Sequence, residues 1–156
     1  MSRFEDALTV TQCSGKSDGW RRWRLHEALV FEAGRRNHGK LIVVPGDFVS
    51  DGPTIPRFLW AVLPVWGTYG RAGVVHDYLC ARIMLGDPHE AARTRTDADG
   101  IFYDAMAALG VGFCTRWAMY VGVRIGTLFG VKPTMLHYNR KLLVEEKINE
   151  DAAQAG

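Results

Sequence analysis

The spacing of hydrophobic and polar positions changes near residue 45 of this chain. Before that point, short stretches alternate apolar and polar side chains or carry β-branched residues, a pattern that predicts strands at 7–13, 20–25, 28–33 and 41–44. After it, apolar residues recur every three to four positions, which is the spacing of helices that bury one face. We expect helices at 56–63, 69–85, 94–109 and 115–129, and an amphipathic helix after Pro133.

These elements predict an α+β fold, in which a small antiparallel N-terminal sheet packs on a C-terminal layer of about four helices. With 156 residues the chain is long enough to bury a core in a single domain, which we place at 1–148. We divide this domain into a strand-rich part (1–44), a proline-rich loop (45–56) and a helical part (57–148). The small and polar residues 149–156 are expected to form a flexible tail.

Composition and charge narrow the function classes. The net charge of +2 is too small to indicate nucleic-acid binding. The three cysteines lie far apart, which argues against a disulfide scaffold and for a reducing compartment. The N-terminus lacks the apolar run of a signal peptide. The basic residues between Arg21 and Arg24 alternate between the two faces of a strand, so a charged sheet edge explains them better than a nucleic-acid site.

Three glycines at intervals of four, Gly122, Gly126 and Gly130, lie in the helix predicted at 115–129 and just after it. The same spacing occurs where membrane helices associate. Arg116 and Arg124 interrupt the apolar run and argue against a membrane-spanning helix, so we expect close packing within the protein. A weaker alternative is a membrane-proximal helix with these arginines at the lipid headgroups.

The proline-rich loop holds the first candidate for chemistry. Pro53 and Pro56 restrict the backbone on either side of Thr54 and Ile55, and Asp51 with Gly52 fits a tight turn. Asp51 therefore lies on a stiff loop, which is how proteins commonly hold a functional carboxylate. The alternative is that Asp51 only caps its own turn or the next helix.

The helix predicted at 69–85 carries the second and third candidates. At about 100° per residue, Arg71 and Arg82 fall on one side of this helix, and His76 and Asp77 on the other. If the arginines mark solvent, His76 and Asp77 point inward, where an ionisable pair needs partners. Gly73 lies one turn before them and leaves room for such a partner.

Asp99 is the fourth candidate. It lies at the edge of the apolar face of the helix predicted at 94–109. Arg95 precedes it by four residues, a spacing that suits a structural ion pair between Arg95 and Asp99. The alternative is that Asp99 joins Asp51, His76 and Asp77 in one site.

The run from Val44 to Pro56 resembles a family found mainly in bacteriophages and prophages and catalogued as domain of unknown function thirteen fifty-three. That family reads Val-Pro-x-Gly-Phe-x-Thr-Asp-Gly-Ala-Ser-Ile-Pro. The departures are mild, because Asp47 stands in place of a glycine, Ser50 in place of threonine, and Pro53-Thr54 in place of Ala-Ser. The later family motifs are met by His76-Asp77, Arg95, Asp99, Phe102 and Ala105-Met106. The resemblance covers roughly residues 41–130 and implies a phage setting without an established activity.

Two functions fit these observations. The first is a phage or prophage accessory or virion-assembly protein, in which the polar residues form a buried structural network and the partner is a phage or host protein. The second is a hydrolase of cell-wall or nucleotide substrates with Asp51, His76 and Asp77 as catalytic residues. In that hydrolase, a divalent metal (zinc, manganese or iron) would have Asp51, His76, Asp77 and Asp99 as ligands. Without a metal, His76 would act as a base, with Asp51 or Asp99 orienting its ring. Both imply a location in the host cytoplasm or the virion, without a nucleic-acid or membrane partner; no oligomeric state follows.

Overall fold

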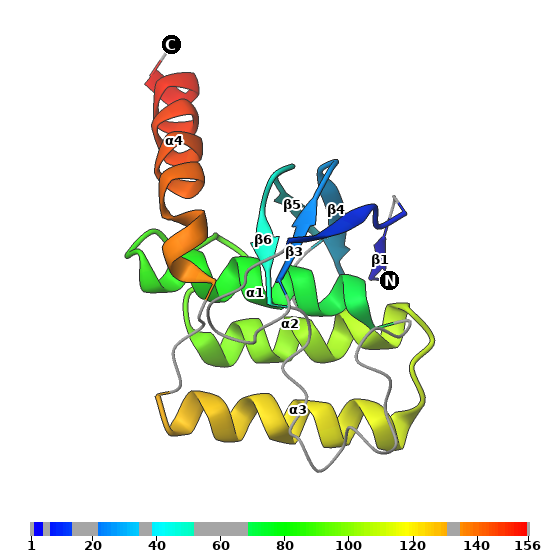
Figure 1. Cartoon of the computed structure of the whole chain (residues 1–156). Coiled ribbons are helices and arrows are strands. Elements are labelled where there is room, and N and C mark those ends of the chain that lie inside the picture. The colour runs from blue at the N-terminus through cyan, green and yellow to red at the C-terminus, as the bar shows by residue number, and fades with distance from the viewer. Residues whose placement is uncertain are drawn as a thin grey trace.

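A computed structural model describes residues 2–4, 7–13, 22–34, 39–51, 69–130 and 135–155 of the chain. Within these residues, six strands precede four helices, which confirms the predicted α+β fold (Figure 1). The helix predicted at 56–63 and the two prolines at 53 and 56 lie outside the described residues. The elements are β1 (Arg3–Phe4), β2 (Val10–Cys13), β3 (Arg22–Leu25), β4 (Leu29–Ala33), β5 (Lys40–Val44), β6 (Val49–Ser50), α1 (Gly70–Met84), α2 (Arg95–Ala108), α3 (Phe113–Leu128) and α4 (Leu136–Ala155).

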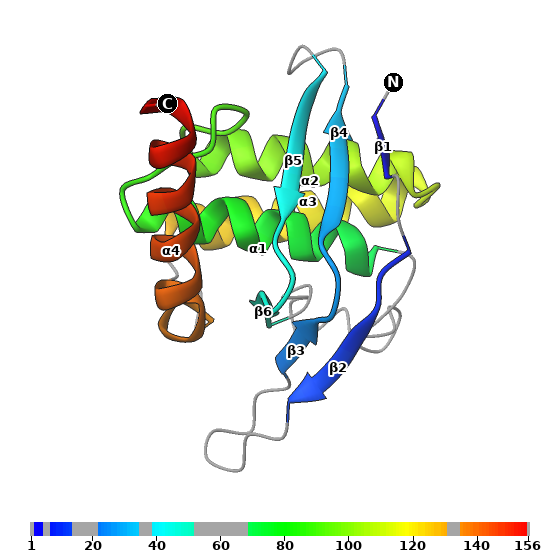
Figure 2. The same cartoon turned by 90° about the horizontal axis from the view of Figure 1, so that it is seen from above.

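The strands form two antiparallel sheets of three strands each, in the orders β1-β4-β5 and β2-β3-β6, where we expected a single sheet. The chain bends between β5 and β6, at Asp47, whose φ of 66° is left-handed. At this bend the Leu25 amide donates to the Phe48 carbonyl and the Asp47 amide donates to the Leu25 carbonyl, each at 2.9 Å. Figure 2 shows the result, in which β5 leads into β6 while β3 leads into β4 beside it.

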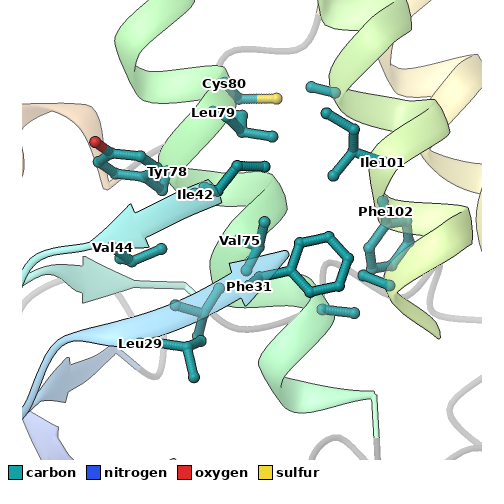
Figure 3. Packing of buried hydrophobic residues seen from close by; sticks show 14 of the residues in the cluster. Leu29, Phe31, Ile42, Val44, Val75, Tyr78, Leu79, Cys80, Ile101 and Phe102 are labelled. Atoms are coloured by element: carbon teal, nitrogen blue, oxygen red, sulfur yellow. The ribbon is translucent and has the colours of Figure 1, made fainter. Parts of the chain in front are cut away.

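Helix α1 is the centre of the molecule. The two sheets lie on one side of it, α2 lies on the other, and α3 covers α2 (Figure 1). In β4 and β5, every second side chain faces the helices. Figure 3 shows this core, which includes Leu29, Phe31, Ile42, Val44, Val75, Leu79, Ile101 and Phe102.

Helix α4 stands beside α1 and β6 and continues to Ala155, through the residues expected to form a flexible tail. Glu150 explains this difference, because its carboxylate accepts hydrogen bonds of 3.1 and 3.0 Å from Arg82 of α1. Arg82 also bonds Asp87 at 2.6 Å and is buried, so the expectation that Arg82 marks solvent is wrong. Among the described residues, no helix is long and apolar enough to cross a membrane.

Candidate functional site

His76 and Asp77 both point into the protein, as expected, but they reach different neighbours. Adjacent residues of a helix project about 100° apart, so one turn of α1 can face two elements. His76 faces α2, and Asp77 faces β6. We call His76, Cys80, Asp99, Arg124 and Thr127 the His76 network, and Ser50, Asp51 and Asp77 the Asp77 network.

Asp99 is the hub of the His76 network and is fully buried on α2. Its Oδ1 accepts a hydrogen bond from Nε2 of His76 at 2.8 Å. Its Oδ2 accepts from Nη1 of Arg124 at 3.2 Å and from the hydroxyl of Thr127 at 2.9 Å. One carboxylate thus joins α1, α2 and α3, and the ring of Phe102 packs against the imidazole with 5.1 Å between ring centroids.

The protonation of His76 follows from these contacts. An ionised carboxylate can only accept, so Nε2 carries a proton. Burial by itself lowers the pKa of His76, but the neighbouring Cys80 and the hydrogen bond to Asp99 outweigh it and raise the pKa to about 10. Burial acts in the opposite sense on Asp99, yet its hydrogen bond to His76 holds the pKa of Asp99 below its ordinary value. At neutral pH the pair is therefore an imidazolium and a carboxylate.

Cys80 lies one turn after His76, with its sulfur 3.6 Å from the same Nε2. In a catalytic triad, one ring nitrogen of the histidine faces the nucleophile and the other faces the carboxylate. Here the same nitrogen, Nε2, faces both Cys80 and Asp99. The geometry of Cys80, His76 and Asp99 is therefore that of a shared hydrogen bond and not that of a catalytic triad.

Asp77 makes no hydrogen bond to a cation among the residues that the structure describes. The hydroxyl of buried Ser50 donates to Oδ2 of Asp77 at 2.5 Å, and the backbone amide of Asp51 donates to the same carboxyl group. Burial raises the pKa of Asp77 to about 7, although the charge of His76 and the Ser50 hydrogen bond oppose the shift. Asp77 is thus a carboxyl group that changes its charge near neutral pH.

The side chain of Asp51 turns from Asp77 toward β3 and the start of α4. Its Oδ2 accepts a hydrogen bond of 3.1 Å from the amide of Met135, the residue before α4. Its Oδ1 lies 4.0 Å from Nε of Arg22, whose guanidinium stacks 4.4 Å from the ring centre of Tyr138. Asp51 therefore holds a helix end that is 84 residues away in sequence, a role that a local capping pattern does not reveal.

Asn139 of α4 fixes β6 in front of Asp77. Its Oδ1 accepts from the amide of Val49 at 2.8 Å, and its Nδ2 donates to the Val49 carbonyl at 2.6 Å. The same Nδ2 donates to the Met135 carbonyl at 3.1 Å. Because Asn139 is fully buried, these bonds hold Ser50 and Asp51 in place from the side of α4.

The four residues predicted as one site therefore divide into two pairs, His76 with Asp99 and Asp77 with Asp51. Among the described residues, no three side chains of histidine, cysteine, aspartate or glutamate are placed to hold a metal ion. The metal-ligand role of the four residues draws no support from this arrangement and stays a prediction, as does the Arg95–Asp99 ion pair. The sequence did not single out five further residues of these networks, which are Arg22, Ser50, Arg124, Thr127 and Asn139.

The chain belongs to the family described as "Protein of unknown function (DUF1353)", whose model matches residues 23–123. It is also similar to "Uncharacterized protein y4jT" from Sinorhizobium fredii (strain NBRC 101917 / NGR234), with 35% identity over 82 residues. That match covers 51% of this chain and 22% of the relative, so the matched segment is less than a quarter of the longer protein. No solved structure matches the chain.

Proposed function

We propose that this member of the family is a non-catalytic accessory protein of a phage or prophage that acts in virion assembly. On this proposal, His76 and Asp77 fix the mutual arrangement of strands and helices and do not touch a substrate. The observation that supports it most is the state of Asp99, whose two oxygens already accept hydrogen bonds from three side chains. A carboxylate satisfied in this way rigidifies a core and specifies one packing of its helices.

The charge of His76 supports the same proposal. A general base must be able to accept a proton near the working pH. The pKa of His76 is raised to about 10, so the imidazole is already protonated at neutral pH. A cation held by a buried carboxylate serves as a structural link between α1 and α2.

The proposal is tested by deleting the gene from the phage or prophage that carries it and counting intact particles. We expect fewer intact particles, and recovery with the wild-type chain. We also expect recovery with a Cys80→Ser variant, because the thiol takes no part in a reaction on this proposal. Normal particle yield after deletion would contradict the assembly role. Failure of a stably folded Cys80→Ser variant would contradict the absence of catalysis.

A second candidate is an acid–base hydrolase centred on Asp77 and Asp51. One observation favours it, namely that the pKa of Asp77 is raised to about 7, where a carboxyl group can donate or accept a proton at neutral pH. Peptidoglycan fragments and nucleotides are the substrates to assay, with and without added zinc, manganese or iron. Turnover by the wild type that Asp77→Asn abolishes would establish this function in place of the first.

Elemental analysis tests whether such a hydrolase depends on a bound metal. Protein purified without chelator is compared with a His76→Ala variant. Stoichiometric metal that disappears in the variant would support a metal centre. A metal-free wild type, together with a large loss of stability in the variant, would support the structural role.

A further inference from the structure

Helix α4 is held to the rest of the protein by two different kinds of contact. In its first part, residues 136–143, the side chains of Asn139 and Leu143 are buried. In residues 144–155, all of which the structure describes, no side chain is buried, and Val144 and Ile148 are exposed by 47% and 61%. Burial of apolar surface therefore contributes little to the docking of this second part. We call residues 136–143 the proximal half of α4 and residues 144–155 the distal half.

Charged groups contact the distal half, and they gather around Arg82 near the end of α1. Both Nη atoms of Arg82 donate to the carboxylate of Glu150, at 3.1 and 3.0 Å. The hydroxyl of Tyr78, one turn before Arg82, donates to the carboxylate of Glu146 at 3.0 Å. Figure 2 shows α4 crossing the end of α1, which brings these side chains of the two helices together.

The groups that the distal half reaches are also bonded to one another. Arg82 donates to the hydroxyl of Tyr78 at 3.0 Å and to the carboxylate of Asp87 at 2.6 Å. A second carboxylate oxygen of Asp87 lies 3.4 Å from Nζ of Lys147, which belongs to the distal half. The side chain of Arg82 is only 7% exposed, whereas those of Glu150 and Lys147 are 45% and 46% exposed. A buried cation is thus fixed on α1, and the charged groups that reach this cluster from α4 lie at the surface.

The buried contacts of the proximal half are neutral. The side-chain amide of Asn139 accepts from the Val49 amide at 2.8 Å and donates to the Val49 carbonyl at 2.6 Å. Leu143 is part of the hydrophobic core. Dissolved salt screens charges that water reaches and has little effect on buried neutral hydrogen bonds. The two halves of α4 should therefore respond differently to ionic strength.

We propose that the distal half of α4 is an ionic latch, which detaches from α1 as the ionic strength rises while the proximal half stays docked. The Debye length falls from about 10 Å at 0.1 M salt to about 3 Å at 1 M, so the charge pairs of the distal half weaken over this range. Opening frees the guanidinium of Arg82 and the hydroxyl of Tyr78 from their partners on α4. It leaves β6 in place, because Asn139 belongs to the proximal half. This inference does not depend on whether the protein is catalytic.

Hydrogen exchange of the full chain, measured by mass spectrometry on peptides that cover 136–143 and 144–150, tests the latch. In the wild type we expect residues 144–150 to exchange about 10-fold faster in about 1 M than in about 0.05 M sodium chloride, and residues 136–143 to change less than about 2-fold. Glu150→Gln should exchange residues 144–150 about 10-fold faster already at the lower salt concentration, and added salt should then have little effect. Glutamine has a similar helix propensity, and the substitution removes a negative charge that the C-terminal end of a helix disfavours. Faster exchange would therefore come from the lost contact with Arg82.

Glu145→Gln is the matched control, because Glu145 lies on the same helix and pairs with Lys141 of α4 itself, at 3.7 Å. This variant should keep the exchange rates of the wild type and their dependence on salt. Three results would overturn the latch. They are exchange of residues 144–150 in the wild type that does not change with salt, equal effects of Glu150→Gln and Glu145→Gln, and exchange of residues 136–143 that accelerates together with that of residues 144–150.

Discussion

His76 and Asp77 are neighbours on α1 and both are largely buried, yet the protein gives them opposite kinds of environment. The imidazolium of His76 lies 2.8 Å from a carboxylate, and its pKa is raised to about 10. The carboxyl group of Asp77 meets a hydroxyl and a backbone amide, and its pKa is raised to about 7. One residue is therefore charged throughout the neutral range, and the other changes its charge within it.

The difference shows that the charge of a buried group depends on the charge of the atoms it touches. Burial disfavours the charged form of both side chains. At His76 the neighbouring Cys80 and the hydrogen bond to Asp99 outweigh the effect of burial on the pKa, whereas at Asp77 the charge of His76 and the hydrogen bonds from Ser50 and Asp51 do not. The His76 network should therefore behave as a permanent ionic link and the Asp77 network as one that responds to pH.

Removal of the Asp99 carboxylate, the hub of the His76 network, should lower the free energy of unfolding most. Asp99→Ala would leave the imidazolium of His76 and the guanidinium of Arg124 without their carboxylate in a buried site. Breaking a buried ion pair in this way costs about 3–5 kcal/mol of unfolding free energy. Denaturant unfolding monitored by circular dichroism measures this loss.

The control for this prediction is Asp104→Ala, which removes a carboxylate from the same helix. Asp104 is only partly buried, and its replacement should change the unfolding free energy by no more than about 0.5 kcal/mol. Equal losses in the two variants would show that Asp99 is not the hub we describe. The comparison of two aspartates of α2 separates the network from the general effect of losing a charge on that helix.

Neutralising Asp77 should have the next largest effect, and its size should depend on pH. Because the folded state raises the pKa of Asp77 from 3.8 to about 7, the native protein keeps this proton longer than the unfolded chain does. The contribution of Asp77 to the free energy of unfolding is therefore fully present below the unfolded pKa and is lost as the pH rises toward the folded pKa. Asp77→Asn cannot lose the proton, so its stability relative to the wild type should increase by roughly 2–4 kcal/mol between about pH 4 and 8.

Unfolding of both proteins at several pH values checks this prediction. The raised pKa of His76 also removes stability, from its unfolded value of 6.5 up to about 10, but the wild type and the variant share most of this loss, because the charge of Asp77 is the smallest of the causes that raise the pKa of His76. The difference between them therefore reports on Asp77. A difference that stays constant with pH would mean that Asp77 is ionised throughout, in contradiction to its environment.

The sequence predicted which residues of α1 turn inward, but not what they meet. Periodicity gives the angle of a side chain about its own helix axis and leaves the neighbouring element undetermined. Arg82 shows the limit, because its partners Asp87 and Glu150 lie beyond the end of α1, and they bury a residue that we expected in solvent. The partners of Asp99 lie 25 and 28 residues away on α3, beyond the reach of a local ion-pair rule.

The sequence predicted the strands but not the order in which they pair or their division into two sheets. The strands predicted at 28–33 and 41–44 correspond to β4 and β5, because strand propensity is a property of a single segment. The division into two sheets depends on the left-handed Asp47 and on hydrogen bonds between Leu25 and the segment before β6. Such contacts join residues about twenty positions apart, so no short pattern encodes them.

The substitutions with the smallest expected effect on stability distinguish the two networks most directly. They remove two hydroxyl groups that each donate to a buried carboxyl group. Thr127→Val removes the donor to Asp99, which stays ionised, so the cost should be about 2 kcal/mol at both pH 5 and pH 8. Ser50→Ala removes the donor to Asp77, which is mainly protonated at pH 5 and mainly ionised at pH 8. Its cost should therefore grow from about 1 to about 2 kcal/mol, since hydrogen bonds to a charged acceptor are roughly twice as strong. If chemical denaturation instead gives the two variants the same pH dependence, then Asp77 and Asp99 share one charge state, and the contrast between neighbouring residues of α1 is lost.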